Sequence, residues 1–332
     1  MENIYNIFES LSEKQLTSKA DLGIETSSIP FVNNHKIGIS KEGYPIFFIK
    51  CNDQGIPTSQ INLKLITIHL QINCELFTNG ISVDKGIYAQ VIFKSESWEL
   101  KKYFIDIFSN FILTLEETED GEKVKSELNK IVNIFSKLSN MPEKSIQGLW
   151  AELLLIKISS DPKYLIDSWH IKKTDKYDFN DGIDKIEVKS TEKIKREHHF
   201  SLEQLITTSN SKLIIASFKT YETGKGTTVF DLSDSIKKRI VDPEAIIKLD
   251  TLISASLGNS FEIAFEKFFD LDYGIENLQF YNSYEIPTIK KDAFPKSLSQ
   301  INFVADLSEI EPVTKLIYKS LLHELINVST IK

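Results

Sequence analysis

Asp178, Glu187 and Lys189 have residue types and a spacing that suit metal-dependent chemistry. Alternate side chains of a strand share one face, so a strand over residues 185–190 presents Glu187 and Lys189 together. The Asn-Asp-Gly sequence at 180–182 is typical of a tight turn, which predicts a hairpin. Such a hairpin places the carboxylate of Asp178 within reach of the carboxylate of Glu187.

Two carboxylates and a main-chain carbonyl, here that of Val188, form an oxygen donor set suited to Mg²⁺. A bound ion activates water and neutralises the charge that develops on phosphorus during phosphodiester hydrolysis. Lys189 then lies beside the attacking water, where it orients the water or offsets negative charge. The alternative is a solvated strand edge, because an Asp followed by Glu-x-Lys is also a common surface pattern.

The elements that must position these residues follow from the periodicity of apolar side chains. In the first part of the chain, the pattern predicts a helix over 3–20, an antiparallel sheet over 30–95 and helices over 97–138. In the second part, it predicts helices over 145–158, from 201, over 233–256, 261–269 and 312–328, and strands over 172–179, 185–190, 211–221, 278–286 and 300–306. The strand at 211–221 is continuously apolar in its centre, which is typical of a strand buried on both faces.

Composition restricts the classes of function. The chain has 332 residues, 39 basic and 47 acidic side chains and a formal charge of −8, which excludes a polybasic nucleic-acid binder. Two cysteines without C-x-x-C spacing argue against a disulfide framework or a zinc site. The sequence shows neither an apolar leader nor a run long enough to span a membrane, so we expect a cytoplasmic protein.

Four segments resemble the PD-(D/E)XK nuclease superfamily, and more closely the bacterial group of PD-(D/E)XK motif proteins. They are GLWAELLL at 148–155, YDF at 177–179, EVKST at 187–191 and HFSLEQL at 199–205, in the order found in that group. The resemblance is clearest over 142–232 and extends more weakly over the whole chain. One departure is Tyr177, which stands where the superfamily's name has proline.

The resemblance implies an α/β fold with a restriction-endonuclease-like core, that is, a mixed central sheet flanked by helices. The helical pattern stops at Asn140-Met141-Pro142, which places a domain boundary near residue 142. We expect an N-terminal β-rich domain with a helical connector over 1–141, the nuclease-like core over 142–232 and C-terminal α+β elements packed on the core over 233–332. Asp178, Glu187 and Lys189 stand in the motif positions of a Mg²⁺- or Mn²⁺-dependent deoxyribonuclease.

Glu152 matches an acidic residue that many such nucleases place on the preceding helix, where it completes the metal shell. Because Glu152 lies in an apolar run, pairing with a lysine or a local hydrogen-bond network is an equal alternative. Gln204 is a candidate contact for a phosphate or a metal-bound water, but the Ser-Leu-Glu-Gln sequence at 201–204 also predicts a capping box. A short basic strip follows the motif and is a candidate phosphate contact or a solvated loop: Lys193, Lys195, Arg196 and His199.

The group is associated with prokaryotic restriction and phage-defence genes, which implies DNA as the target. It also implies two kinds of protein partner, a helicase-like ATPase and a DNA methyltransferase. The acidic net charge favours delivery of the substrate by such partners. Two alternatives stay open: a catalytically inactive nuclease-like scaffold that binds the same partners, and a nuclease that acts on RNA.

Overall fold

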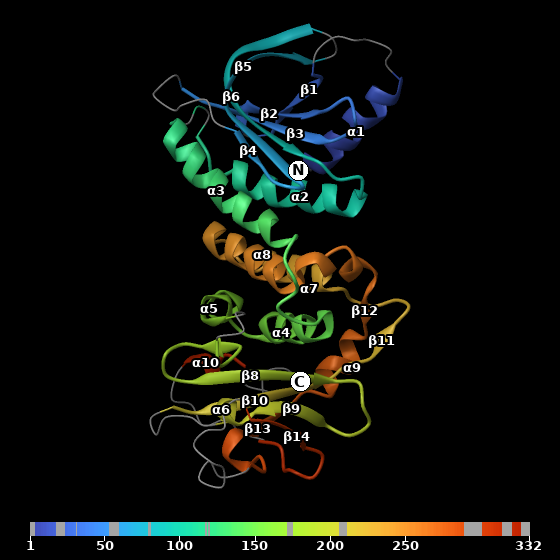
Figure 1. The fold of residues 1–332 in the computed structure, drawn as a ribbon, viewed down its shortest axis with the longest axis vertical. Helices are drawn as coiled ribbons and strands as arrows, with labels where there is room; N and C mark the ends of the chain where they lie inside the picture. Colours follow the sequence, from blue (N-terminus) through green and yellow to red (C-terminus); the bar gives the residue numbers. More distant parts are fainter. Residues whose placement is uncertain are drawn as a thin grey trace. The chain divides into compact units, whose positions relative to one another are not determined.

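The structure is a computed structural model of the chain (Figure 1). It describes residues 4–17, 24–30, 32–52, 60–78, 81–116, 118, 120–170, 175–205, 211–288, 301–313 and 321–326. The chain divides into two compact units, Met1–Asn140 and Met141–Lys332. The further division at residue 232 stays a prediction.

The N-terminal unit is built on a six-stranded sheet in which neighbouring strands are antiparallel. The strands lie in the order β1-β2-β3-β6-β5-β4. Their bounds are Thr26–Ile29 (β1), Val32–Ile39 (β2), Pro45–Lys50 (β3), Gln60–Asn62 (β4), Ile66–Thr78 (β5) and Ile81–Phe93 (β6). The antiparallel sheet predicted for residues 30–95 is therefore confirmed.

Aromatic side chains attach helices to this sheet. The three helices of the unit's described residues are Ile4–Thr17 (α1), Trp98–Ile112 (α2) and Gly121–Lys137 (α3). Phe47 of β3 stacks on Phe108 of α2 with ring centroids 4.3 Å apart. Phe93 of β6 stacks on Phe104 of α2 at 4.5 Å. Such pairs add about 0.5–1.5 kcal/mol each beyond the burial of their area, so the apolar stripe of α2 is well fixed.

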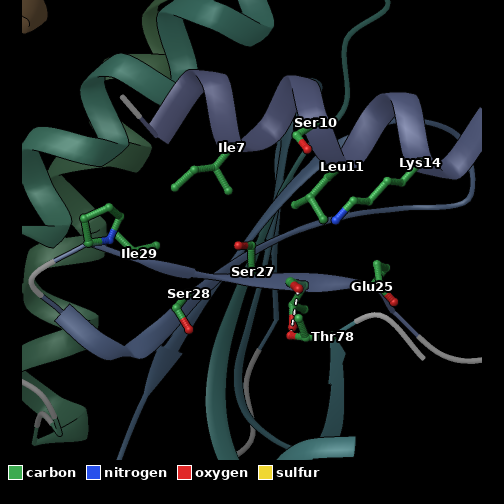
Figure 2. Close-up of a pocket in the computed structure, with 11 residues that line it drawn as sticks. Ile7, Ser10, Leu11, Lys14, Glu25, Ser27, Ser28, Ile29 and Thr78 are labelled. Carbon is green, nitrogen blue, oxygen red and sulfur yellow. Dashed lines mark hydrogen bonds between the residues drawn. The ribbon is translucent and has the colours of Figure 1, made fainter. Parts of the chain in front are cut away.

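A pocket of about 430 Å³ lies between α1 and β1 in the N-terminal unit (Figure 2). Ile7 and Leu11 line it from the helix, and Ser27 and Ile29 line it from the strand. Its lining includes none of the site residues predicted from the sequence. The predicted chemistry belongs to the C-terminal unit.

The C-terminal unit contains a four-stranded mixed sheet in the order β13-β10-β8-β7. The two central strands are parallel, and the two outer pairs are antiparallel. Its strands are Phe179–Asn180 (β7), Lys185–Thr191 (β8), Leu213–Lys219 (β10) and Gln279–Asn282 (β13). Two further strand pairs join Glu197–Ser201 (β9) to Asn302–Asp306 (β14) and Glu222–Thr223 (β11) to Phe268–Phe269 (β12).

Helices complete this mixed α/β unit, in agreement with the predicted α/β class. The α-helices are Ile146–Ile158 (α4), Pro162–Ser168 (α5), Leu202–Leu205 (α6), Val229–Lys237 (α7), Pro243–Leu257 (α8), Leu271–Glu276 (α9) and Leu321–Glu324 (α10). The short 3₁₀ helices are Gly258–Ser260 (η1), Ile263–Glu266 (η2) and Ser283–Glu285 (η3). Across the parts of the chain described, no helix combines the length and the apolar character needed to cross a membrane.

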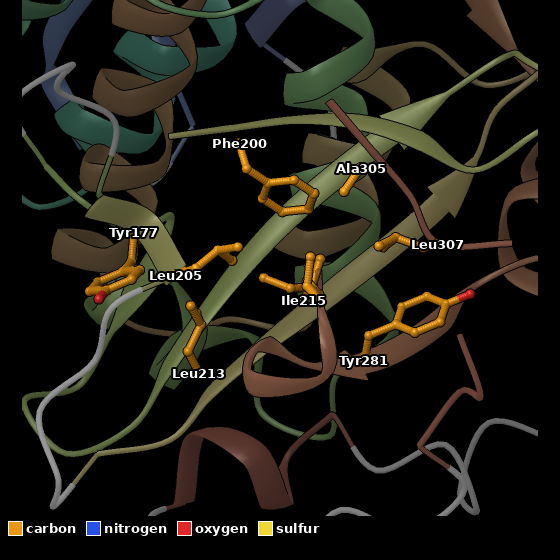
Figure 3. Packing of buried hydrophobic residues seen from close by; sticks show 9 residues of the cluster. Tyr177, Phe200, Leu205, Leu213, Ile215, Tyr281, Ala305 and Leu307 are labelled. Carbon is orange, nitrogen blue, oxygen red and sulfur yellow. The ribbon is translucent and has the colours of Figure 1, made fainter. Parts of the chain in front are cut away.

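The mixed sheet is buried on both sides. On one side, Leu213 and Ile215 of β10 pack with Phe200, Tyr281 and Leu307 in one apolar cluster (Figure 3). On the other side, α4 packs against β8 (Figure 1), and every residue of α4 from 149 to 156 is buried. A helix that is apolar all round needs such complete cover. Glu152 of α4 and Glu187 of β8 therefore lie largely out of water.

Several predicted elements differ from the structure in length. Of the strand predicted over 172–179, the described residues 175–179 contain only Phe179 in a strand, at the start of β7, and residues 171–174 lie outside the described part of the chain. The helix predicted over 233–256 is two helices, because Asp242 caps a new helix that Pro243 begins. Of the helix predicted over 312–328, the described residues contain only the single turn α10.

The helix predicted over 261–269 is wrong. The chain forms the 3₁₀ turn η2 and then enters strand β12, with an extended conformation at Lys267. Phe261 and Phe265 both pack on the ring of Phe230, and the Phe265 ring stacks at 3.9 Å. Because tertiary contacts of this kind outweigh local propensity, the helical spacing of the apolar residues did not predict the structure.

Two glycines in the loop between β11 and α7 provide a matched test of how closely this loop approaches strand β12. A Cβ added at Gly226 would lie 2.5 Å from the main-chain oxygen of Phe269, whereas one added at Gly224 meets nothing within 4 Å. We expect Gly226→Ala to lower the free energy of unfolding by about 1–3 kcal/mol, because the backbone has to shift. Gly224→Ala should change it by no more than about 0.5 kcal/mol. Denaturant titration of both variants checks this; equal stabilities would contradict the close approach.

Candidate active site

Strand β8 carries Glu187 and Lys189 into the interior of the C-terminal unit. Glu187 is the register partner of Ile215 in the parallel strand β10. Its side chain therefore lies on the face of the sheet that carries the apolar cluster of Ile215. Only 4% of Glu187 is exposed. The ammonium group of Lys189 lies 5.3 Å from the ring centroid of Phe200. Burial of this extent excludes a solvated strand edge.

Asp178 lies just before β7 and reaches across to β8. Its Oδ2 accepts a hydrogen bond of 2.8 Å from the main-chain amide of Val188. Its own carbonyl accepts one of 2.8 Å from the amide of His170. The sequence predicted Asp178 at the end of a strand, and the structure places it in a bend beside the strand end. Val188 joins the site through its amide, whereas the sequence assigned a role to its carbonyl.

Glu152 projects from the apolar helix α4 and is 3% exposed. Its Oε2 accepts a hydrogen bond of 2.6 Å from the indole nitrogen of Trp169. Its Oε1 lies 2.5 Å from the ammonium group of Lys144. Of the two alternatives for Glu152, the lysine pair is the arrangement that the structure contains.

Lys144 is a site residue that sequence reasoning missed. Its Nζ lies 2.5 Å from Oε1 of Glu152 and 2.6 Å from Oδ1 of Asp178, so one ammonium group joins the two acids. The residue precedes Ser145, the N-cap of α4, and carries no motif of its own. The one available signal was indirect, since a carboxylate in an apolar helix requires a compensating cation.

Glu187 has two partners of its own. Its Oε1 lies 2.7 Å from Nζ of Lys189 and accepts a hydrogen bond of 2.9 Å from the carboxamide of Gln204. The side-chain Oε1 of Gln204 accepts a hydrogen bond from the main-chain amide of Ser201, and the main-chain amide of Gln204 donates one to the Ser201 hydroxyl. The predicted capping box therefore forms through the carboxamide oxygen of Gln204, and the carboxamide nitrogen donates to Glu187.

Burial and mutual repulsion change the acidity of this cluster. Burial, and secondly the neighbouring charge of Asp178, raises the pKa of Glu152 to about 8 and the pKa of Glu187 to about 7. The adjacent carboxylates raise the pKa of Lys144 and of Lys189 above the usual value for lysine, although burial opposes this. Both ammonium groups are therefore charged at neutral pH, while both glutamates titrate near it.

The donor set has the chemistry of a divalent cation site. Carboxylate oxygens are the ligands that Mg²⁺ prefers, and Glu152, Asp178 and Glu187 supply them from three elements. In the described residues, however, no group of three or more His, Cys, Asp or Glu side chains is arranged so that it could hold a metal ion. The oxygens of Glu152 and Asp178 that face each other are bridged by Lys144. The residues therefore fit a divalent metal in the chemistry of their oxygens, while the arrangement described here holds Lys144 between Glu152 and Asp178.

The predicted basic strip separates into surface and core residues. Lys193 and Lys195 are exposed, and each pairs with an acid, Glu197 at 2.8 Å and Asp306 at 3.4 Å. His199 is also exposed. Arg196 is 5% exposed.

The guanidinium group of Arg196 donates to the carbonyl and hydroxyl of Ser217 and to the carbonyl of Asn277. Because these bonds hold the group in the core, the prediction that Arg196 contacts nucleic acid needs correction. Its role is to join β9, β10 and the end of α9.

The sequence profile of one protein family matches residues 4–308, and its description is "Putative PD-(D/E)XK family member, (DUF4420)". The matched region covers nearly all of the chain. The chain therefore belongs to this PD-(D/E)XK family, and it is a nuclease-like protein. No curated protein matches the chain, and no solved structure matches it.

The raised pKa of Glu187 predicts a pH-dependent stability. The folded chain favours the protonated acid, so this stabilisation is complete below the ordinary pKa of 4.5 and is lost as the pH rises through about 7. Relative to Glu187→Gln, the wild-type free energy of unfolding should fall by roughly 2–3 kcal/mol between pH 4.5 and 8. Denaturant titrations at several pH values measure the difference. A constant difference would contradict the burial of an ionisable acid here.

Arg196 and Lys195 form a matched pair for testing the basic strip. Arg196→Met should lower the free energy of unfolding by about 2–4 kcal/mol, because the carbonyl and hydroxyl of buried Ser217 and the carbonyl of Asn277 lose their donor. Lys195→Ala should change stability by no more than about 0.5 kcal/mol. Thermal and chemical unfolding measure both. An Arg196→Met chain as stable as the wild type would contradict the structural role.

Proposed function

We propose that this chain is a metal-dependent nuclease that hydrolyses phosphodiester bonds of DNA. The observation that carries the proposal is that Glu187 pairs with Lys189 inside the C-terminal unit, while Asp178 binds the intervening amide of Val188 and raises the pKa of Glu187. These residues come from a bend and a strand, and the chain belongs to a nuclease-like family. Buried acids with raised pKa values beside lysines are typical of catalytic sites rather than of structural surfaces.

In this proposal, Asp178 and Glu187 hold Mg²⁺ or Mn²⁺, and Glu152 is a further ligand. The ion, when bound, supplies charge neutralisation at the phosphate and lowers the pKa of a bound water. Lys189 orients the attacking water or offsets negative charge at the phosphate, because its ammonium group is held next to Glu187. Gln204 keeps the Glu187 carboxylate in one orientation by its hydrogen bond.

The exposed residues Lys193, Lys195 and His199 are candidates for contacts with DNA phosphates in this proposal. A chain with a formal charge of −8 has a weak general attraction to DNA. We therefore propose that partner subunits deliver the substrate. The family resemblance favours a helicase-like ATPase and a DNA methyltransferase of a prokaryotic restriction or phage-defence system.

Substitution of Lys189 tests the catalytic assignment. Lys189→Ala should lower DNA cleavage about 10²- to 10⁴-fold, as expected for a group that acts in the chemical step. It should retain Mn²⁺ binding in calorimetry, whereas Asp178→Asn should lose both binding and cleavage. Lys185→Ala, on the same strand, is the control and should cleave like the wild type. Wild-type cleavage by Lys189→Ala refutes the assignment.

The same measurements separate the alternatives. A scaffold without activity predicts that the folded wild-type chain binds no Mn²⁺ at Asp178 and cuts neither DNA nor RNA. An RNA nuclease predicts metal binding at Asp178 together with cleavage of RNA but not of DNA. Parallel assays on both nucleic acids, with and without a chelator, distinguish the three cases.

A further inference from the structure

The ammonium group of Lys144 occupies the place between two acids of the site. It lies 2.5 Å from Oε1 of Glu152 and 2.6 Å from Oδ1 of Asp178. Oxygen ligands of Mg²⁺ lie at about 2.0–2.1 Å from the ion. An ion that bound both of these oxygens from the side that Lys144 holds would come too close to its nitrogen. The ion and the ammonium group exclude one another there.

Each acid presents one oxygen to this point and keeps the other fixed. Trp169 donates to Oε2 of Glu152, and the amide of Val188 donates to Oδ2 of Asp178. These two donors do not depend on Lys144. The carboxylates therefore keep their orientation when the ammonium group leaves, and Oε1 and Oδ1 stay available to another cation.

The formal charges favour such an exchange. Glu152, Asp178 and Glu187 contribute three negative charges when ionised, and Lys144 and Lys189 contribute two positive ones. A divalent ion in place of Lys144 balances the three acids together with Lys189. With Lys144 still in place, the same ion would leave an excess of positive charge in a buried site, which is unfavourable.

The side chain of Lys144 is partly exposed, and its backbone is anchored independently of the ammonium group. Its side chain is 14% exposed, so part of the lysine already reaches the surface of the unit. Its main-chain amide donates to the carbonyl of Ser256, which anchors the backbone. The long flexible stem of a lysine can therefore swing outward without unfolding the segment before α4.

We propose that Lys144 is a built-in counter-ion that holds Glu152 and Asp178 together in the metal-free chain and is displaced when a divalent metal binds. This inference rests on the proposed function, because it concerns the same metal. It makes Lys144 a positioning residue and a determinant of metal affinity. Substitution of Lys144 should therefore strengthen metal binding, whereas substitution of a ligand weakens it.

Calorimetric titration with Mn²⁺ at pH 8 tests the direction of the effect. Lys144→Met and Lys144→Gln should bind Mn²⁺ about tenfold or more tightly than the wild type, because a competing like charge is removed. In the presence of a chelator, Lys144→Met should have a lower melting temperature than the wild type. Mn²⁺ should raise the melting temperature of Lys144→Met by more than it raises that of the wild type. Unchanged or weaker Mn²⁺ binding by the folded Lys144 variants overturns the inference.

Lys237→Met is the matched control. Lys237 pairs with Asp250 at 2.6 Å, and its side chain is also 14% exposed. This variant should bind Mn²⁺ with wild-type affinity. If Lys144→Met folds only with Mn²⁺, the ion has replaced the ammonium group, which supports the inference. If the wild type binds no Mn²⁺, or Asp178→Asn binds it equally well, the proposed function fails. If the wild type and Asp178→Asn behave as expected and only the Lys144 variants do not, the counter-ion role of Lys144 is refuted and the proposed function stands.

Discussion

Desolvation of acidic side chains is the constraint on which the C-terminal unit depends. Glu152 and Glu187 are 3% and 4% exposed, and an ionised carboxylate so deeply buried requires paired charge and donated hydrogen bonds. The structure provides two ammonium groups, an indole, a main-chain amide and a carboxamide: Lys144, Lys189, Trp169, Val188 and Gln204. The buried acids are stable in this interior because these groups are present.

The compensating groups come from different elements, so the site forms only when the unit is assembled. Helix α4 brings Glu152, the bend before β7 brings Asp178, and strand β8 brings Glu187. The apolar cover of the sheet excludes water from them, which strengthens every electrostatic interaction among them. The packing that stabilises the unit thus also raises the pKa values of Glu152 and Glu187.

The cluster differs from an ordinary buried ion-pair network in its acidity. Structural pairs combine an acid with a base and hold the acid's pKa low, whereas here burial and Asp178 hold the pKa values of two glutamates near neutrality. Such acids gain or lose protons with small changes in their surroundings, including the arrival or departure of a cation. That property connects the stability of the fold to the proposed metal-dependent reaction.

The sequence by itself determined most of the elements, because periodicity reports which faces are apolar. It predicted the antiparallel sheet, the α/β class and the alternation that brings Glu187 and Lys189 together. It did not predict Lys144, the burial of Arg196 or the 3₁₀ turn at η2. Each of these depends on residues distant in the chain: Glu152 and Asp178, Ser217 and Asn277, and Phe230. Only the tertiary structure decided them, since local patterns carry no record of which distant groups meet once water is excluded.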